Sequence, residues 1–217
     1  MSVKPKVLVI GYDPDTAYMF KQQGWDLATS KEEPDLVCFT GGEDVNPKLY
    51  NEEEHYSSYV NEERDALEQK VFEKYERYPK VGICRGGQLL NVLSGGEMWQ
   101  NVNKHGLAGT HTMVDLITGE MIEVTSTHHQ MMIPHKDCEV LAIAWEANKF
   151  EAGHPNTNRE SPPHDTEVVW YRSTNSLCFQ PHPEYDYAPE DCTNYFFGLI
   201  QTFWNLKGVT KKEVEAA

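Results

Sequence analysis

The stretch "KVGICRGGQLLNVL", residues 80–93, joins a short apolar run to a helical pattern through one cysteine flanked by glycines. Its first five residues predict a buried strand, and the leucines that follow predict the packing face of a helix. Gly82 and Gly86 permit a sharp turn between the two elements, with Cys84 at its apex. The stretch therefore predicts a strand–turn–helix unit of an α/β fold.

Short apolar runs of the same kind recur along the chain. The early ones are continuous, as expected of strands buried on both faces, and those after residue 120 are closely spaced, which favours hairpins. We therefore expect an α/β fold whose central sheet is mostly parallel and flanked by helices, flavodoxin-like, with additional antiparallel strands in the C-terminal half. The predicted strands are 6–11, 35–40, 80–84, 121–127, 139–145, 167–172 and 176–180.

Two further segments have helical periodicity. Over residues 61–78 the apolar positions recur at helical spacing, so we expect them to pack on the sheet. Near the C-terminus a wide apolar stripe predicts a second packed helix. The residues of the first stripe are Leu67, Val71, Tyr75 and Tyr78, and those of the second are Tyr195, Phe196, Leu199, Ile200, Phe203 and Trp204.

The bulk composition limits the possible functions. A length of 217 residues favours one domain, 1–217, and a net charge of −15 disfavours binding to nucleic acid or anionic lipid. No run is long enough for a signal peptide or a membrane span, so we expect a cytoplasmic protein in which the five cysteines are reduced. The nine histidines show no paired ligand spacing, so we expect neither a metal nor a cofactor.

Cys84 has two interpretations. An isolated cysteine after an apolar strand is usually core filling. A thiol at a strand-to-helix turn can instead be exposed as a nucleophile, with its thiolate favoured by the helix N-terminus. Such a nucleophile needs a base, and "FQPHPEY", residues 179–185, supplies His182 and Glu184 on the same side of an extended segment. On its own that motif also fits a solvated loop.

Attack on an amide also requires donors for the oxyanion. The backbone amide of Arg85 is one candidate, and "TGGEDV", residues 40–45, supplies another through Gly41 and Gly42. These segments and His182 all follow predicted strands. Because ligands of parallel sheets bind beyond the carboxyl ends of the strands, we expect the segments to meet there.

Five segments, in order along most of the chain, resemble the class I glutamine amidotransferase-like superfamily, and within it γ-glutamyl hydrolases of the γ-glutamyl-γ-aminobutyrate hydrolase type. They are residues 40–50, 63–68, 82–100, 125–130 and 179–184. The resemblance implies a nucleophile, a general base then acid, and an orienting carboxylate, which are Cys84, His182 and Glu184. It implies oxyanion donors at Gly42 and Arg85, a glutamyl-binding Gln88, and a pocket for the α-amino and α-carboxylate groups lined by Ser126 and by His128 or His129.

The implied reaction is cleavage of the γ-glutamyl amide bond of glutamine or of a γ-glutamyl amine or peptide, through a γ-glutamyl thioester. The "CRG" around Arg85 favours a free-standing hydrolase. Two alternatives stay open: a glutaminase subunit that delivers ammonia to a separate synthetase chain, and a catalytically inactive binding relative. The leaving amine cannot be read, and the polar segment 153–166 is either a mobile loop or a specificity lid.

Overall fold

The structure, a computed structural model, describes residues 4–11, 13–106, 109–153 and 159–209. Its main sheet has nine strands among these residues. The five from β2 to β13 are parallel, and every later neighbour is antiparallel, so the predicted mixed sheet is confirmed. In spatial order the strands are β2 (Asp26–Leu27), β1 (Lys6–Ile10), β3 (Leu36–Phe39), β4 (Lys80–Ile83), β13 (Ser176–Phe179), β12 (Asp165–Tyr171), β10 (Glu139–Ala144), β7 (Thr110–Asp115) and β8 (Met121–Thr125).

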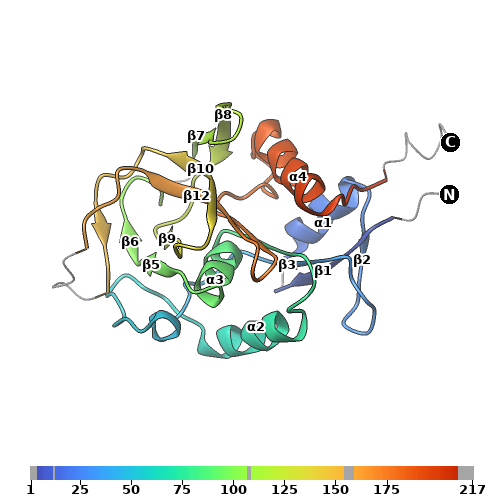
Figure 1. The fold of residues 1–217 in the computed structure, drawn as a ribbon, viewed down its shortest axis with the longest axis horizontal. Coiled ribbons are helices and arrows are strands. Elements are labelled where there is room, and N and C mark those ends of the chain that lie inside the picture. The colour runs from blue at the N-terminus through green and yellow to red at the C-terminus, as the bar shows by residue number, and fades with distance from the viewer. Residues whose placement is uncertain (1–3, 12, 107–108, 154–158, 210–217) are drawn as a thin grey trace.

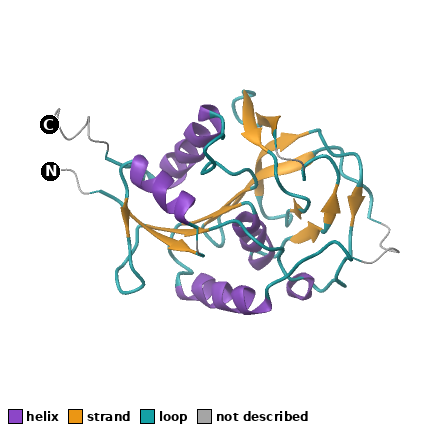
Figure 2. Cartoon of the chain, turned by 180° about the vertical axis from the view of Figure 1, so that it is seen from behind, coloured by secondary structure: helices purple, strands orange, loops and turns teal. Residues whose placement is uncertain are grey.

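Helices cover both faces of the parallel half (Figure 1). On one face lie α1 (Pro14–Gln22) and α4 (Glu190–Trp204), and on the other lie α2 (Glu62–Lys74), α3 (Arg85–Leu93) and the short 3₁₀ helix η1 (Pro47–Tyr50). Two short antiparallel pairs lie beyond the antiparallel half, as Figure 2 shows from behind. They are β5 (Glu97–Trp99) with β9 (Met131–Ile133), and β6 (Asn101–Val102) with β11 (Phe150–Glu151).

Two apolar cores result from this layering. Between the sheet and α4, Phe196 and Ile200 are fully buried with Val81. Between the sheet and α3, Leu89 and Leu90 are fully buried on the opposite face. Parallel strands buried on both faces are expected to be apolar throughout, which is why their runs are legible in the sequence.

The structure confirms the apolar stripe of residues 61–78 in part: Tyr75 is buried, Val71 and Tyr78 pack against the same core, and Leu67 is the exception on helix α2. The helix ends at Lys74, and Leu67, expected to pack on the sheet, is 62% exposed. Its buried residues include the acids Asp65 and Glu68, because both carboxylates form ion pairs with the buried guanidinium of Arg85 on α3.

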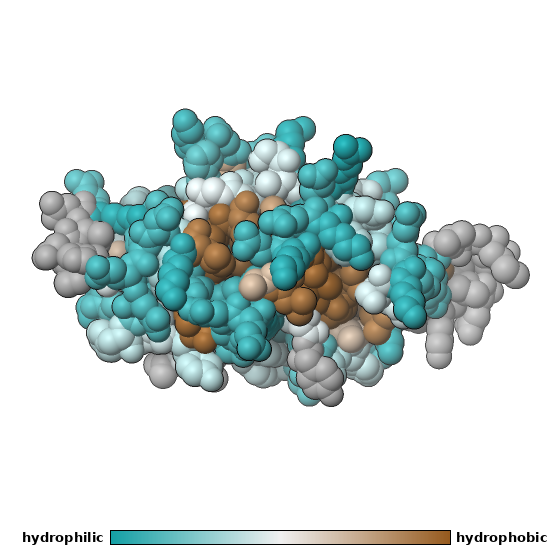
Figure 3. All heavy atoms as spheres, turned by 90° about the horizontal axis from the view of Figure 1, so that it is seen from below, coloured by the Kyte–Doolittle hydropathy of each residue, from teal (hydrophilic) through white to brown (hydrophobic). Residues whose placement is uncertain are grey.

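Figure 3 shows the molecule from below, where exposed apolar side chains lie in groups among hydrophilic ones.

The antiparallel half also departs from the expectation. Strand β7 has alternating buried and exposed residues, with a histidine, His111, among the buried ones, so its sequence carries no continuous apolar run. Strand β8 ends at Thr125, two residues before the predicted end. The residues that follow, 126–130, form a loop rather than a strand.

The turn at Cys84 requires close backbone packing. A Cβ atom on Gly86 would overlap the carbonyl of Phe39 in β3, which cannot swing aside as a flexible side chain could. We expect Gly86→Ala to lower the free energy of unfolding by about 1–3 kcal/mol, measured by urea denaturation. Gly198→Ala is the matched control: a Cβ there meets nothing within 4 Å, so it should stabilise α4 by about 0.5–1 kcal/mol. Equal effects of the two changes would contradict the packing argument.

Candidate active site

Cys84 lies at the turn between β4 and α3, in a backbone conformation that side chains rarely adopt. Its φ is 49° and its ψ is −112°, and it occupies the N-cap position of α3. The Cys84 N–H donates to the carbonyl of Phe179 at 2.7 Å, and its carbonyl accepts from the N–H of Gln88 at 2.9 Å. Such strain persists only where the surroundings enforce it, and it is the property of a nucleophile turn.

His182 and Glu184 follow β13 and form a tight buried pair. The imidazole Nδ1 lies 2.6 Å from the carboxylate Oε1, and both residues are more than nine-tenths buried. The His182 N–H donates to Thr125 Oγ1 at 2.6 Å, which fixes the backbone between the two flanking prolines. The ring of Tyr185 stacks on the imidazole with centroids 4.2 Å apart. These contacts leave the imidazole one orientation.

The imidazole holds its proton firmly. Burial alone would lower the pKa of His182, but the charge of the Cys84 sulfur, a hydrogen bond with it and the Glu184 carboxylate together raise the pKa to about 10. The Cys84 sulfur is thus one of the groups that favour the protonated ring. The arrangement can hold a thiolate–imidazolium pair, in which the nucleophile is ionised and the proton is ready for a leaving group.

The pKa of His182 provides a test of that pair. In Cys84→Ser the negative charge is lost, so the pKa should fall by at least about one unit, the lower range for loss of an adjacent opposite charge. A negative neighbour stabilises the positively charged imidazolium, so losing that neighbour lowers the pKa of His182. The measurement is an NMR titration of the His182 ring signals. Cys138→Ser, at a half-buried thiol in another part of the chain, should leave the titration unchanged. An unaltered pKa in Cys84→Ser would show that thiol and ring do not interact.

The glycine loop after β3 passes directly beside this ring. A Cβ on Gly41 would lie 2.7 Å from His182 Cε1, and Gly42 has a φ of +143°, a value that favours glycine. Arg64 Nη2 donates to the carbonyls of Gly41 at 2.9 Å and of Thr40 at 3.2 Å. Since a trans peptide points its C=O and N–H in opposite directions, the Gly42 N–H faces away from Arg64.

The backbone N–H and the guanidinium of Arg85 have different surroundings. As the first residue of α3, its backbone N–H has no acceptor within the helix and can serve an anion beside Cys84. Its guanidinium is buried against Asp65 and Glu68 and joins α3 to α2. Glu68 also accepts from Arg64 Nε at 2.8 Å, so one ion-pair network joins Arg85 to the glycine loop. Single motifs in the sequence do not reveal this network.

Two glutamines connect the thiol to the loop after β8. Gln180 Nε2 lies 3.6 Å from Cys84 Sγ, and its Oε1 accepts from Gln88 Nε2 at 3.1 Å. Gln88 Nε2 also lies 3.3 Å from the carbonyl of Gln130. Gln88 is thus close to the site, and its amide is held by protein acceptors. Gln180 is absent from the predicted site. The signal that could have found it is its position directly after a buried strand, where site residues of such sheets lie.

The remaining predicted residues separate into two environments. Ser126 and His128 are buried: Ser126 Oγ lies 3.0 Å from the ring of His105, and His128 Nδ1 lies 2.8 Å from the carbonyl of Gln130. His129 is partly exposed, and its Nε2 lies 3.1 Å from the carboxylate of Asp44. Of the three side chains, only that of His129 is open to solvent on the described surface.

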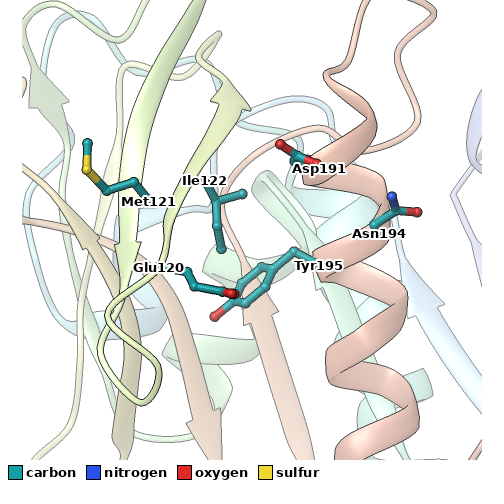
Figure 4. A pocket seen from close by; sticks show the side chains of 6 residues that line it. All are labelled: Glu120, Met121, Ile122, Asp191, Asn194 and Tyr195. Carbon is teal, nitrogen blue, oxygen red and sulfur yellow. The ribbon is translucent and has the colours of Figure 1, made fainter.

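A surface depression of ≈ 690 Å³ borders the glycine loop, and Gly41, Gly42 and Arg64 are in its lining. Another of ≈ 380 Å³ lies between β8 and α4 and is lined by Glu120, Met121, Ile122, Asp191, Asn194 and Tyr195 (Figure 4). None of these is a predicted site residue.

Part of the segment 153–166, residues 154–158, lies outside the described residues. No helix among the described residues is long and apolar enough to cross a membrane.

Residues 20–154 match the sequence profile of Peptidase C26. The chain belongs to the Peptidase C26 family. The matched range includes Cys84 and ends before His182. The match therefore covers the turn at Cys84 and the glycine loop, and the His182–Glu184 pair lies outside it.

Two curated relatives agree with the family, and a solved structure agrees with the fold. A glutamine amidotransferase-like protein of Lactococcus lactis subsp. cremoris is 34% identical over 119 residues, 54% of this chain and 61% of that protein. The carbamoyl phosphate synthase small chain of Helicobacter pylori is 29% identical over 121 residues, 56% of this chain and 28% of that protein. The chain thus spans less than two thirds of either relative. A glutamine amidotransferase of Thermotoga maritima shares the fold, with a TM-score of 0.58, 12% identity, and coverage of 93% and 84% of the two chains.

Proposed function

We propose that this protein is a cysteine hydrolase that cleaves the γ-glutamyl amide bond of glutamine or of a γ-glutamyl amine or peptide. The observation that carries the proposal is the strained Cys84 at the N-terminus of α3, together with a buried imidazole that Glu184 orients and whose pKa the Cys84 sulfur helps to raise. Membership of the Peptidase C26 family supports the same reaction class. A core cysteine would need neither the strained turn nor the oriented imidazole.

In the first half-reaction the Cys84 thiolate attacks the δ-carbonyl carbon of the γ-glutamyl group, forming a C–S bond. The carbonyl oxygen becomes an oxyanion, which the N–H groups of Gly42 and Arg85 stabilise. The imidazolium of His182 donates its proton to the amide nitrogen, and the C–N bond breaks. Ammonia or an amine leaves, and a γ-glutamyl thioester remains on Cys84.

In the second half-reaction His182, now neutral, takes a proton from water. The hydroxide attacks the thioester carbonyl, the C–S bond breaks, and glutamate leaves while the thiolate of Cys84 returns with the imidazolium. Glu184 holds the ring through Nδ1, so that the other ring nitrogen exchanges the proton. Atoms balance as one amide plus one water giving glutamate plus one amine.

For the glutamyl group itself we propose Gln88 and His129 as contacts, with Ser126 and His128 as further candidates. His129 can reach a ligand without giving up a buried hydrogen bond, because its partner Asp44 lies near the surface. Ser126 and His128 would each have to exchange a buried contact to do so. A charge-paired His129 suits the α-carboxylate, since bonding to Asp44 raises the pKa of His129.

A second candidate is a glutaminase subunit that delivers ammonia to a synthetase. The similarity to a carbamoyl phosphate synthase small chain favours it. The deciding experiment follows glutamate release by the purified chain alone, with glutamine and with a panel of γ-glutamyl amines. Turnover of γ-glutamyl amines without a partner supports the free-standing hydrolase, and turnover of glutamine only after addition of a synthetase supports the subunit. No turnover and no adduct with an electrophilic glutamine analogue would make the chain an inactive binding relative.

A further inference from the structure

A second cluster of polar side chains lies buried in the antiparallel half of the molecule, apart from the thiol. It brings together His111 of β7, Asp165 and Glu167 of β12, and His105 and His128 from two loops. Each of the five is at most 8% exposed. The His105 ring stacks on the His128 ring with centroids 4.4 Å apart and meets the His111 ring edge-on at 5.0 Å.

The hydrogen bonds inside this cluster leave several atoms without a partner. His105 bonds Asp165 at 3.0 Å and His111 bonds Glu167 at 3.0 Å. Four buried atoms have no hydrogen-bond partner within the protein: His111 Nδ1, His128 Nε2, Asp165 Oδ1 and Glu167 Oε2. An unsatisfied buried polar atom costs about 1–3 kcal/mol, so a cluster that holds several of them calls for a ligand.

His128 indicates what kind of ligand this is. Its Nδ1 lies 2.8 Å from the carbonyl of Gln130, an acceptor, so Nδ1 carries the hydrogen and Nε2 carries a lone pair. That lone pair is buried and unpartnered. A ring that donates through one nitrogen to a backbone carbonyl while the other is deprotonated is the usual arrangement of a metal-ligating histidine.

We propose that this cluster is a buried metal site that binds Zn²⁺ or a similar divalent transition metal through His105, His111, His128 and Glu167. His105 would exchange its Nδ1 contact with Ser126 for the metal and keep Asp165 on Nε2. One ligand atom from each of His105, His111 and Glu167 already lies within 4.8 Å of the others. Tetrahedral Zn²⁺ places its ligands about 3.4 Å apart, so these three atoms would approach one another by up to about 1.4 Å on binding, and His128 would move in as the fourth ligand. Imidazole nitrogens with one carboxylate are donors that suit zinc.

Each of the two buried carboxylates has a histidine partner, His111 for Glu167 and His105 for Asp165. Glu167 and Asp165 are fully buried, and two carboxylates held out of water are stabilised by a divalent cation. Asp165 Oδ2 additionally accepts the N–H groups of Glu146 at 2.6 Å and Ala147 at 2.8 Å, so it suits a supporting position behind His105 rather than a ligand position.

The site would fix the loop after β8. Through His128 the metal would hold Gln130, whose carbonyl accepts from Gln88, and Gln88 contacts Gln180 beside Cys84. The proposed role is therefore structural: the metal joins β7, β12 and the two loops into one unit next to the catalytic turn. No step of the proposed hydrolysis passes through it. With the metal bound, His128 would have no free ring nitrogen for the glutamyl group, which leaves that contact to the other candidates.

The test uses Zn²⁺ alone on the full chain in a Cys84→Ser background, because a thiolate beside His182 can itself bind zinc. The protein is stripped with a chelator and titrated against a chromogenic zinc indicator. We expect one equivalent to bind. Glu167→Gln, and separately His128→Gln, should weaken the affinity by at least about 100-fold, since each removes one ligand. His135→Gln, a partly exposed histidine on the loop after β9, is the matched control and should bind as the parent does.

A second measurement does not depend on those variants folding. Co²⁺ in place of Zn²⁺ in the Cys84→Ser chain should give the visible absorption of a tetrahedral site with nitrogen and oxygen ligands, lacking a sulfur-to-metal band. The proposal is overturned if less than one equivalent of Zn²⁺ binds to the Cys84→Ser chain, if Glu167→Gln and His128→Gln bind as tightly as His135→Gln, or if Co²⁺ gives an octahedral spectrum. Retained hydrolysis with no bound metal would refute this site and leave the proposed function standing.

Discussion

Cys84→Ala is expected to lower kcat/KM for γ-glutamyl amide hydrolysis by about 10⁴-fold or more, as removal of a nucleophile does in triad enzymes. The reason is that the thioester cannot form without the sulfur. His182 and the glycine loop would keep only the residual catalysis of a positioned base and oxyanion donors. Glutamate release from γ-glutamyl amines and from glutamine measures the loss, and mass spectrometry of the quenched wild type should show a γ-glutamyl adduct on residue 84.

The control for this change is Cys138→Ala, because Cys138 is a half-buried free thiol outside the candidate site. It should retain wild-type turnover and the adduct. If Cys84→Ala keeps activity within tenfold of the wild type, or if the adduct forms on another cysteine, the nucleophile has been assigned to the wrong residue. Circular dichroism of each variant separates loss of the thiol from loss of the fold.

The parallel half of the fold was predictable because a strand buried on both faces has apolar residues at successive positions, which form a continuous run in the sequence. β3, with the sequence LVCF, and β4 are buried at every position. Their order along the chain, with helices between them, then requires crossovers and a parallel sheet. The position of Cys84 followed as well, since a strand, a small-residue turn and a helix in succession allow few geometries.

Helix α2 shows where such patterns fail. Periodicity assigns the apolar residues of a helix to its buried face, yet Asp65 and Glu68 take that face and Leu67 stays exposed. The decisive partner, Arg85, lies 17 residues after Glu68, and a buried charge is stabilised only by such a partner. No local spacing contains that information.

The histidine cluster was beyond sequence reasoning for a related reason. Paired ligand spacings reveal metal sites whose ligands share one helix or turn. Here the candidate ligands come from β7, β12 and two loops, and only the register of β7, β10 and β12 in the sheet brings His111 and Glu167 within 3.0 Å. Each histidine, taken alone in the sequence, has the surroundings of an ordinary polar residue.

Arg64 is expected to be the second most damaging position. Arg64→Met should lower kcat by about 10²-fold, the loss typical of one oxyanion donor, because Arg64 Nη2 holds the Gly41 carbonyl and thereby orients the Gly42 N–H. KM should change little, since the oxyanion exists only after attack. The rate of acyl-enzyme formation, normalised to active sites titrated with an electrophilic glutamine analogue, measures the effect per folded molecule.

Two further variants separate orientation from charge. Arg64→Lys keeps the positive charge beside Glu43 and Glu68 but cannot match the forked contacts to Thr40 and Gly41, so it should restore stability more than kcat. Lys48→Met removes an exposed ion pair at the start of α2 without touching the glycine loop, and kcat should be unchanged. If Arg64→Met lowers only the fraction of titratable sites, with full activity per site, then Arg64 supports the fold and the oxyanion donor is positioned by other contacts.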